Sequence, residues 1–367
     1  MNGSAAGFGR RKVRVLIADD SAVMRSLLRM VFETTPAIEV VAAAATGTEA
    51  LAEFSHVNPD LVLLDIEMPG MNGLDVLSAI RGQNRRVPII MCSTLTLRGA
   101  QITIEALSRG ATDYVTKPAA QRGFREAVDT LARELIPKVR AFFPQDTACS
   151  PGPVPAIAGA PHFGAAPAPR VVVIGVSTGG PAALEVLLPK IPASFPLPIL
   201  IVQHMPRLFT GLLAERLNSL CALRVREAAP DTRVEPGVVE IARGDWHLEL
   251  SRDFHLQLNQ NEPENFCRPS VDVLFRSAAS ATLGRLLGIV LTGMGSDGLA
   301  GCRAIREAGG AVFVQDASSS VIWGMPGAVA NAGLAHKTLP LAAIAQEMMR
   351  VLPRSSAALA LSEAAAL

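Results

Sequence analysis

The sequence predicts an α/β protein made of two domains, each a doubly wound parallel sheet. In both halves of the chain, short apolar runs rich in Val, Ile and Leu alternate with longer stretches of helical period. Such runs are typical of strands buried on both faces, and their alternation with helices is typical of parallel sheets. Between about residues 142 and 170 this periodicity is lost and Pro, Ala and Gly dominate, which indicates a linker.

Length and composition agree with this organisation. The 367 residues suffice for two domains of ordinary size, and a hydrophobic content of 49% is enough for a sizeable core. The net charge of +1 gives no electrostatic reason to expect a nucleic-acid partner. No apolar run is long enough to span a membrane, and the basic N-terminus leads into a strand instead of a signal sequence.

Cysteine usage favours a reducing compartment. The five cysteines lie far apart and form no C-x-x-C pair, which fits reduced thiols in a cytoplasm better than a disulfide framework or a zinc site. They are Cys92, Cys149, Cys221, Cys267 and Cys302. We therefore expect a cytoplasmic protein that is not inserted in a membrane.

Composition and periodicity divide the chain into four segments. We expect a first domain over residues 12–138, a Pro/Ala-rich linker over 139–169, a second domain over 170–353 and a flexible tail over 354–367. Five strands are expected in the first domain, with helices between and after them: Val13–Ala18, Glu39–Ala44, Asp60–Leu64, Val87–Met91 and Thr112–Thr116.

Chemically active side chains stand at the ends of these strands. Asp19 and Asp20 follow the first strand, Asp65 the third, Ser93 the fourth and Lys117 the fifth. Such ends converge on one crevice in an open α/β sheet. Three carboxylates there would repel one another without a hard cation, so we expect a Mg²⁺ site, and the lysine and hydroxyl beside it suit a phosphoryl group. Helix caps and a surface lysine are the alternative, but five such residues on one edge are improbable by chance.

These residues resemble the response-regulator receiver domain over residues 13–136, which implies a flavodoxin-like fold. The resemblance includes the acidic pair after the first strand and the run from Asp65 to Gly73. It implies that Asp65 accepts a phosphoryl group, that Ser93, Tyr114 and Lys117 form the phosphoryl switch, and that Asp19, Asp20 and Asp65 bind Mg²⁺. It also implies a cis peptide bond before Pro118.

In the second half, five β regions and five helices are expected. The β regions are Val171–Val176, Leu197–Val202, Val238–Leu258, Leu286–Leu291 and Ala311–Val314. Within the third, the alternating runs 237–241 and 246–250 flank the turn residues 243–245, which favours a β-hairpin formed by these two runs. The helices are Pro181–Leu188, Phe209–Leu217, Val271–Thr282, Gly298–Ala308 and Leu339–Leu352.

One strand-to-helix turn carries a single exposed hydroxyl among glycines. The run Gly175-Val176-Ser177-Thr178-Gly179 fits the nucleophile-elbow pattern, and the helix that follows offers free N–H groups and positive potential to an oxyanion. Two other interpretations stay open: Ser177 or Thr178 caps the helix, or the loop binds a phosphate.

A nucleophilic serine needs a base and an acid that orients it. His204 and Asp297 each follow a predicted strand, on the same sheet edge as Ser177. His247 and His255 belong to the hairpin region, where we expect exposed or cross-strand positions, and His336 is the reserve base. Asp316 is the second choice for the acid, whereas Asp272 has the position of a first-turn helix residue.

The chain resembles the chemotaxis response regulator protein-glutamate methylesterase family. The resemblance covers both domains, from Val13 to about Leu352. Four motifs carry it: residues 175–181, 203–206, 269–275 and 291–298. The chain order Ser, His, Asp also differs from the Ser, Asp, His order of α/β-hydrolases. The resemblance implies a Rossmann-like esterase domain with a β-hairpin insertion.

The resemblance implies a phosphorylation-activated serine hydrolase. Ser177 would attack glutamate methyl esters on methyl-accepting chemotaxis receptors, His204 would move the proton and Asp297 would orient the imidazole, with no cofactor in the esterase site. The backbone N–H groups of Thr178 and Met294 are the oxyanion-hole candidates, because both lie on glycine-flanked turns. The same chemistry on an amide implies glutamine deamidation.

Regulation is also implied by the resemblance. The chemotaxis histidine kinase would phosphorylate Asp65, and the receiver would cover the esterase cleft until then. Two alternatives come from other protein classes: a signalling adaptor without catalysis, and a transcription regulator. The second half has no basic recognition helix, which disfavours the latter.

Overall fold

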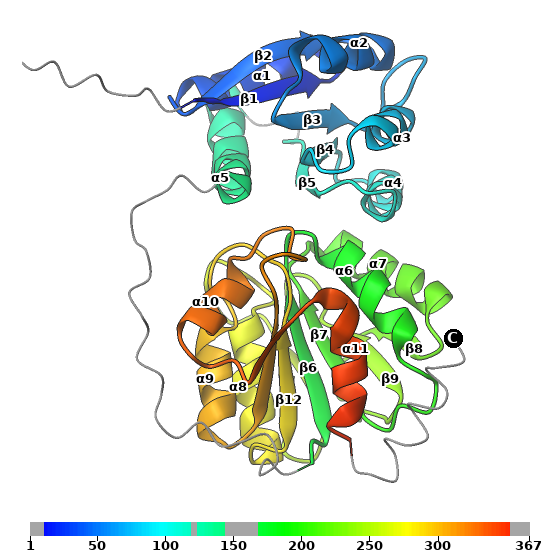
Figure 1. Ribbon diagram of the computed structural model, residues 1–367, viewed down its shortest axis with the longest axis vertical. Helices are drawn as coiled ribbons and strands as arrows, with labels where there is room; N and C mark the ends of the chain where they lie inside the picture. Colours follow the sequence, from blue (N-terminus) through cyan, green and yellow to red (C-terminus); the bar gives the residue numbers. More distant parts are fainter. Residues whose placement is uncertain (1–10, 119–122, 144–167, 353–367) are drawn as a thin grey trace, which may run out of the picture. The chain divides into compact units, whose positions relative to one another are not determined.

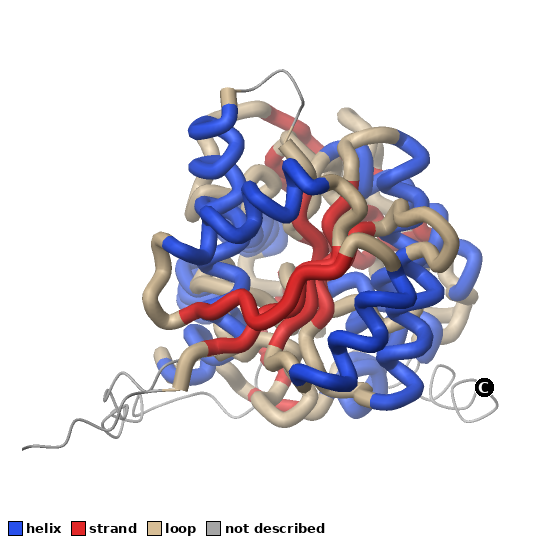
Figure 2. The backbone as a smooth tube through the Cα atoms, turned by 90° about the horizontal axis from the view of Figure 1, so that it is seen from above, coloured by secondary structure: helices blue, strands red, loops and turns tan. Residues whose placement is uncertain are grey.

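The computed structural model describes residues 11–118, 123–143 and 168–352. The chain divides into two compact units, residues 1–145 and 146–367. Most of the expected linker, the expected tail and Cys149 lie outside the described residues. In each unit, helices flank a parallel sheet on both faces (Figures 1 and 2). No helix in the described ranges combines the length and apolarity needed to cross a membrane.

The first unit contains a five-stranded parallel sheet in the order β2-β1-β3-β4-β5. Its strands are β1 (Val13–Ala18), β2 (Ile38–Ala44), β3 (Leu61–Asp65), β4 (Ile89–Ser93) and β5 (Asp113–Thr116). Its helices are α1 (Ala22–Glu33), α2 (Gly47–Val57), α3 (Gly73–Gln83), α4 (Leu97–Ser108) and α5 (Phe124–Phe142). Polar side chains begin the first four helices by accepting a backbone N–H: Ser21, Thr46, Asn72 and Thr96.

Two details of this unit differ from the sequence-based expectations. Helix α5 continues past residue 138 to Phe142, because Val139 is fully buried in the hydrophobic core and keeps the last turn on the sheet. The expected cis bond before Pro118 is wrong: the cis peptide of the described residues is Arg268–Pro269. The Lys117 N–H nevertheless donates to the Ser93 carbonyl at 2.7 Å, so the strand end keeps its place beside β4.

The second unit contains a seven-stranded parallel sheet in the order β14-β13-β12-β6-β7-β9-β8. Its strands are β6 (Val171–Val176), β7 (Ile199–Gln203), β8 (Arg224–Glu227), β9 (Val238–Ile241), β12 (Leu286–Val290), β13 (Ala311–Gln315) and β14 (Lys337–Leu339). A separate antiparallel pair is formed by β10 (His247–Leu250) and β11 (Leu256–Asn259).

Two groups of helices cover the faces of this sheet. Helices α6 (Gly180–Leu187), α7 (Arg207–Leu220) and α11 (Leu341–Arg350) pack together on one face. Helices α8 (Val271–Thr282), α9 (Leu299–Glu307) and α10 (Met325–Asn331) pack on the other. Both faces of β6 are therefore covered, and all six of its residues are buried.

The hairpin is formed by other strands than the sequence pattern predicts. The run 237–241 does not pair with 246–250: β9 lies parallel to β7 and β8, and β10 pairs with β11 instead. The reason is burial, since all four residues of β9 are buried and need a covered sheet on both sides. The short strands β8 and β14 and helix α10 were not predicted, because each has too few apolar residues in period to be recognised.

Candidate active site

The site of the second unit lies at the point of the sheet where the strand order reverses. Strand β6 is flanked by β7 on one side and β12 on the other, because the strands that follow it in the chain are added first on one side and then on the other. Ligands in open α/β sheets bind at this switch point, outside the carboxyl ends of the strands. Ser177 follows β6, His204 follows β7, and Asp297 lies in the loop after β12.

Backbone hydrogen bonds hold Ser177 in a tight turn. Its N–H donates to the Thr292 carbonyl at 3.0 Å, and its carbonyl accepts from the Gly180 N–H at 2.8 Å. Gly179 has φ 76°, a value that favours glycine. A Cβ at Gly293 would lie 2.8 Å from the Ser177 Cβ. The glycines around Ser177 are therefore needed for the close approach of β6 and the loop after β12.

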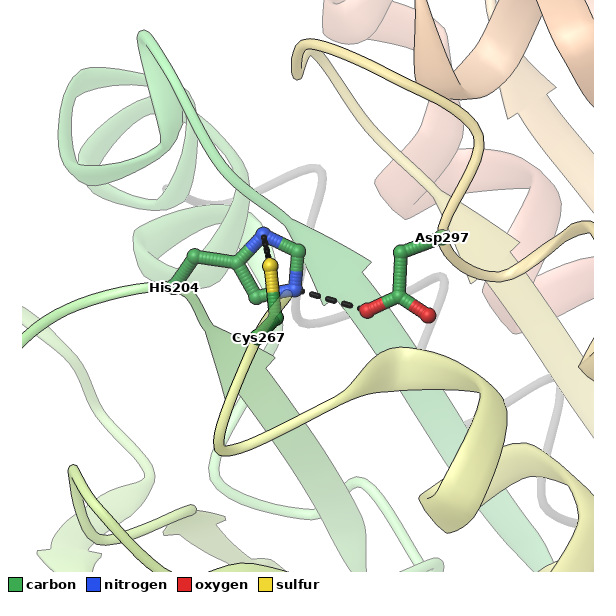
Figure 3. Close-up of side chains that lie close together, drawn as sticks. All are labelled: His204, Cys267 and Asp297. Atoms are coloured by element: carbon green, nitrogen blue, oxygen red, sulfur yellow. Dashed lines mark hydrogen bonds and ion pairs between the residues drawn. The ribbon is translucent and has the colours of Figure 1, made fainter. Parts of the chain in front are cut away.

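The structure brings His204 and Asp297 together, as Figure 3 shows. The His204 Nε2 lies 2.8 Å from the Asp297 Oδ2. The Nδ1 atom faces Cys267, whose Sγ is 3.7 Å away. No hydrogen bond joins the Ser177 hydroxyl to His204 within the described ranges, so the Ser177–His204 step stays a prediction. Since Nε2 is occupied, Nδ1 is the nitrogen left to accept a proton.

Asp297 is saturated with hydrogen bonds. Besides His204, its two oxygens accept from three backbone N–H groups and two side chains, at 2.7–3.0 Å: Val271, Asp272 and Gly298, and Asn265 and Ser270. Burial alone would raise the pKa of Asp297, but the hydrogen bond from His204 and those from the start of α8 outweigh it and lower the pKa to about 2. The carboxylate is therefore a fixed negative charge that orients the imidazole.

The imidazole holds its proton tightly in return. Burial would lower the pKa of His204, but the hydrogen bonds to Asp297 and Cys267 raise it to about 9. His204 must therefore lose this proton before it can act as a general base.

Gln203, the last residue of β7, ties the two sides of the site together. It is 2% exposed, and its Nε2 donates to the Ser177 carbonyl at 3.0 Å and to the His204 carbonyl at 3.3 Å. Gln203 begins the motif at residues 203–206, which predicts no role for it. Its place at a strand end, next to the candidate base, was the available signal.

Two of the other described histidines, His247 and His336, serve the fold. His247 has the expected cross-strand position, opposite Asn259 in the β10–β11 pair, and is 1% exposed. Its Nδ1 accepts the Ser270 N–H at 3.2 Å and so holds the start of α8. His336 lies against Arg306, and burial together with this charge lowers its pKa to about 4, which makes it a poor base. Asp316 accepts from the hydroxyls of Ser318 and Ser319 and closes a turn.

The two oxyanion-hole candidates border the serine turn. Thr178 is buried, and its carbonyl accepts the Thr292 hydroxyl at 2.9 Å. Within residues 168–352, the Met294 N–H donates to no protein acceptor. This leaves the Met294 N–H available to a substrate oxygen.

The cluster of His204, Cys267 and Asp297 could be taken for a metal site, since one donor atom of each lies within 4.8 Å of the others. Both Asp297 oxygens already accept at least two hydrogen bonds, and the His204 Nε2 is committed to one of them. The donor set is therefore filled by the protein, and the cluster fits acid–base chemistry better than metal binding.

The first unit places its acidic residues at the switch point of its own sheet, between β1 and β3. One oxygen each from Asp19, Asp20 and Asp65 lies within 4.8 Å of the others. The Lys117 Nζ lies 2.8 Å from both Asp19 and Asp65. Burial and then the charge of Asp19 raise the pKa of Asp65 to about 6, against the opposing effect of Lys117.

This arrangement fits a divalent cation and a phosphoryl group. Oxygen ligands of several carboxylates are what Mg²⁺ prefers, and a cation would relieve the repulsion between Asp19 and Asp65. A pocket of about 160 Å³ opens beside them, and Asp20, Asp65, Ser93 and Lys117 are among its lining residues. Ser93 is buried and shares a 2.7 Å hydrogen bond with the Thr103 hydroxyl. Tyr114 is buried on the neighbouring strand, with the Lys138 Nζ 5.2 Å from its ring centre.

Comparisons with known proteins match both units. The family model described as CheB methylesterase matches residues 172–348, and the response regulator receiver domain model matches residues 15–129. A protein-glutamate methylesterase/protein-glutamine glutaminase of Trichodesmium erythraeum is 47% identical over 352 residues, 92% of this chain and 99% of that protein. One of Nocardioides sp. is 46% identical over 354 residues, 93% of this chain and 96% of that protein. The crystal structure of the Thermotoga maritima CheB methylesterase catalytic domain is 39% identical, covers 50% of this chain and 99% of that one, and has a TM-score of 0.49.

Proposed function

This chain belongs to the family of protein-glutamate methylesterases/protein-glutamine glutaminases, and from that premise we propose that it hydrolyses glutamate methyl esters on chemoreceptors and deamidates receptor glutamines. The observation that carries the proposal is the His204–Asp297 pair, set at the sheet's switch point beside the glycine-lined turn of Ser177. Both a base and its orienting acid are then at hand for a serine nucleophile.

The reaction begins when the His204 Nδ1 accepts the proton of the Ser177 hydroxyl. The serine oxygen attacks the ester carbonyl, and the N–H groups of Thr178 and Met294 stabilise the oxyanion. His204 then returns the proton to the departing methanol. Water enters, loses its proton to His204, and releases the glutamate carboxylate from Ser177. With a glutamine amide, ammonia leaves in place of methanol.

Asp297 stays ionised throughout. A carboxyl with a pKa near 2 does not take up the imidazole proton at neutral pH, so its part is to fix the ring and to stabilise the imidazolium. Gln203 holds the carbonyls of Ser177 and His204 on one side chain, so we propose that it positions the nucleophile relative to the base.

The first unit is the regulatory half, with Asp65 as the residue that accepts a phosphoryl group from a histidine kinase. Asp19, Asp20 and Asp65 would hold Mg²⁺, which neutralises charge on the phosphoryl oxygens. Lys117 would contact the same group. Removal of the Lys117–Asp65 ion pair and rearrangement of Ser93 and Tyr114 would report phosphorylation to the rest of the unit.

Phosphorylation would activate the esterase by shifting a population. The phosphorylated receiver must favour the active state by a few kcal/mol to move most molecules into it. We place the protein in the cytoplasm, where both the kinase and the receptor glutamates are reached.

The test is methanol release from methylated receptor membranes by the purified full chain, with and without a small phosphoryl donor and Mg²⁺. Release that rises with the donor supports the esterase, the receiver and their coupling. Release that ignores the donor keeps the esterase and refutes the coupling. No release from folded protein, with several receptors, refutes the esterase and favours an adaptor.

A further inference from the structure

A thiol stands in front of the only free nitrogen of the catalytic imidazole. The Cys267 Sγ lies 3.7 Å from the His204 Nδ1, whereas Asp297 bonds the other ring nitrogen, Nε2 (Figure 3). Cysteine, histidine and aspartate so arranged resemble an activated cysteine nucleophile: a thiol beside an imidazole whose positive charge favours the thiolate, and the imidazole oriented by a carboxylate. His204 therefore serves two candidate nucleophiles, Ser177 and Cys267.

The position of Cys267 is built into the site. Glu264 and Cys267 exchange two backbone hydrogen bonds, at 3.1 and 2.9 Å, which close a turn before α8. Two 2.6 Å contacts between Arg276 and Glu264 tie this turn to the helix. From the same turn, the Asn265 side chain donates to Asp297 at 3.0 Å. The turn that carries the Cys267 thiol is thus hydrogen-bonded to Asp297, the carboxylate that holds His204.

The other described cysteines lack this combination of access and base. Cys92 and Cys302 are buried, and burial raises the pKa of both thiols, which makes them inert. Cys221 is partly exposed, but burial and the charge of Glu185 raise its pKa to about 11. Cys267 is partly exposed and faces an imidazole that carries a proton at neutral pH.

We propose that Cys267 is a modification site of the active centre, where a hydroperoxide oxidises the thiol to a sulfenic acid and thereby stops ester hydrolysis. The inference rests on the proposed esterase function for its effect on activity. The modification itself depends only on the contact between Cys267 and His204.

The oxidation step balances with these groups. Cys267 gives its proton to water, and the protonated His204 stabilises the thiolate. The sulfur then attacks the hydroxyl oxygen of the hydroperoxide, which breaks the O–O bond and forms an S–O bond. The sulfur is oxidised by two electrons and the peroxide is reduced; the leaving oxygen takes the proton from His204 and departs as water or an alcohol. A small thiol reverses the change by forming a mixed disulfide with loss of water, and a second thiol then frees Cys267.

The added oxygen would block the base. The Nε2 atom of His204 is committed to Asp297, so only Nδ1 can receive the Ser177 proton. A sulfenic acid on Cys267 places a hydroxyl at this nitrogen, where it competes with the serine hydroxyl for the same lone pair. Ser177 then has no base, although its own turn is unchanged.

The first experiment treats the full chain with hydrogen peroxide and measures the methanol released, as a fraction of the untreated activity of each variant. We expect the wild-type chain to lose about tenfold or more of its activity and to regain it with a small thiol. After the same peroxide treatment, Cys267→Ser should retain the activity that this variant had before treatment. The control Cys221→Ser should behave as wild type, because Cys221 lies at the far end of α7, about 20 Å along the helix from His204. Equal inactivation of wild type and Cys267→Ser overturns the proposal.

The second experiment needs no esterase activity and no stable Cys267 variant. Brief alkylation with iodoacetamide is followed by mass spectrometry of each cysteine. We expect Cys267 to react about tenfold or more faster than Cys221, with the same rate in Ser177→Ala and a loss of this advantage in His204→Ala. If Cys267 reacts in this way but no methanol is released, the esterase proposal fails and the thiol assignment stands. A Cys267 rate that ignores His204→Ala refutes the assignment.

Discussion

Each sheet has a buried aspartate at its carboxyl edge, and the pKa values of these two aspartates are shifted in opposite directions. Asp65 and Asp297 are 3% and 2% exposed, so burial does not distinguish them. Burial and then the charge of Asp19 raise the pKa of Asp65 to about 6. Asp297 accepts six hydrogen bonds and has a pKa lowered to about 2.

The difference shows that fixed donors, more than burial, decide what a carboxylate at a switch point can do. With few donors and a like charge beside it, Asp65 has oxygens left for a cation and a phosphoryl group. With all its oxygens filled, Asp297 cannot react and can only orient its partner. We therefore expect the same sheet geometry to yield a reactive carboxylate, Asp65, in one unit and an inert one, Asp297, in the other.

The two units should differ most in their response when the candidate nucleophile, Ser177, is removed. Ser177→Ala should lower methanol release by about 10⁴-fold or more, because it removes the hydroxyl that attacks the ester. Phosphorylation of Asp65 should be unchanged, and the melting temperature should show that the variant is folded. Methanol release at the wild-type rate would assign the reaction to another residue.

The inert carboxylate is tested by Asp297→Asn, which keeps the shape and removes the charge. We expect activity to fall by about 10³- to 10⁴-fold, because the imidazolium is no longer stabilised and the ring is held less firmly. Asp272→Asn is the matched control: Asp272 is also buried and lies in the first turn of α8, from which Asp297 accepts hydrogen bonds, but it bonds Gly301 and Asn265 instead of His204. An equal loss in both variants would mean that the start of α8, and not the charge on His204, is what matters.

The proton held by His204 predicts the pH dependence of the esterase. A base with a pKa of about 9 is about 1% neutral at pH 7 and half neutral at pH 9, so kcat/KM should rise about 50-fold between these values and level off above about pH 10. Cys267→Ser should move this rise to lower pH, since the Cys267 contact contributes to the raised pKa. A profile that is flat above pH 7 would show that the imidazole is neutral there.

The reactive carboxylate should lower stability at neutral pH. The native pKa of Asp65, about 6, exceeds the unfolded value of about 4, so its contribution is favourable below pH 4 and is lost as pH rises through 6. Without Mg²⁺, Asp65→Asn should therefore raise the free energy of unfolding of the first unit by about 2–3 kcal/mol at pH 7.5 and by little at pH 4. Urea unfolding of the full chain at both pH values measures this. A loss of stability at pH 7.5 would mean that the Lys117 ion pair outweighs desolvation.

The smallest effect is expected at Gln203. Gln203→Met keeps the volume but removes both hydrogen bonds to the carbonyls of Ser177 and His204, so kcat should fall about tenfold while KM changes little. Gln257→Met, at an exposed position of β11, should leave both constants unchanged. An increase in KM with constant kcat would make Gln203 a substrate-binding residue instead.

The sequence by itself determined the two parallel sheets and most of what stands at their edges. The valine-rich runs are buried on both faces wherever they end up, so their local pattern already predicts strands such as β6. Because parallel strands end at a common edge, Asp19, Asp65 and Lys117, and likewise His204 and Asp297, could be brought together without a structure.

Only the tertiary structure decided how strands paired and how the site's atoms face one another. The run at 238–241 alternates as a hairpin strand would, yet its burial places it between β7 and β8. The segment at 265–272 meets the loop after β12. This contact supplies hydrogen bonds to Asp297 and places the Cys267 thiol at the His204 Nδ1, which leaves Nε2 as the atom that bonds Asp297. Such contacts join residues that are far apart in the chain, so no local pattern records them, and they arise only when both segments pack against the same sheet.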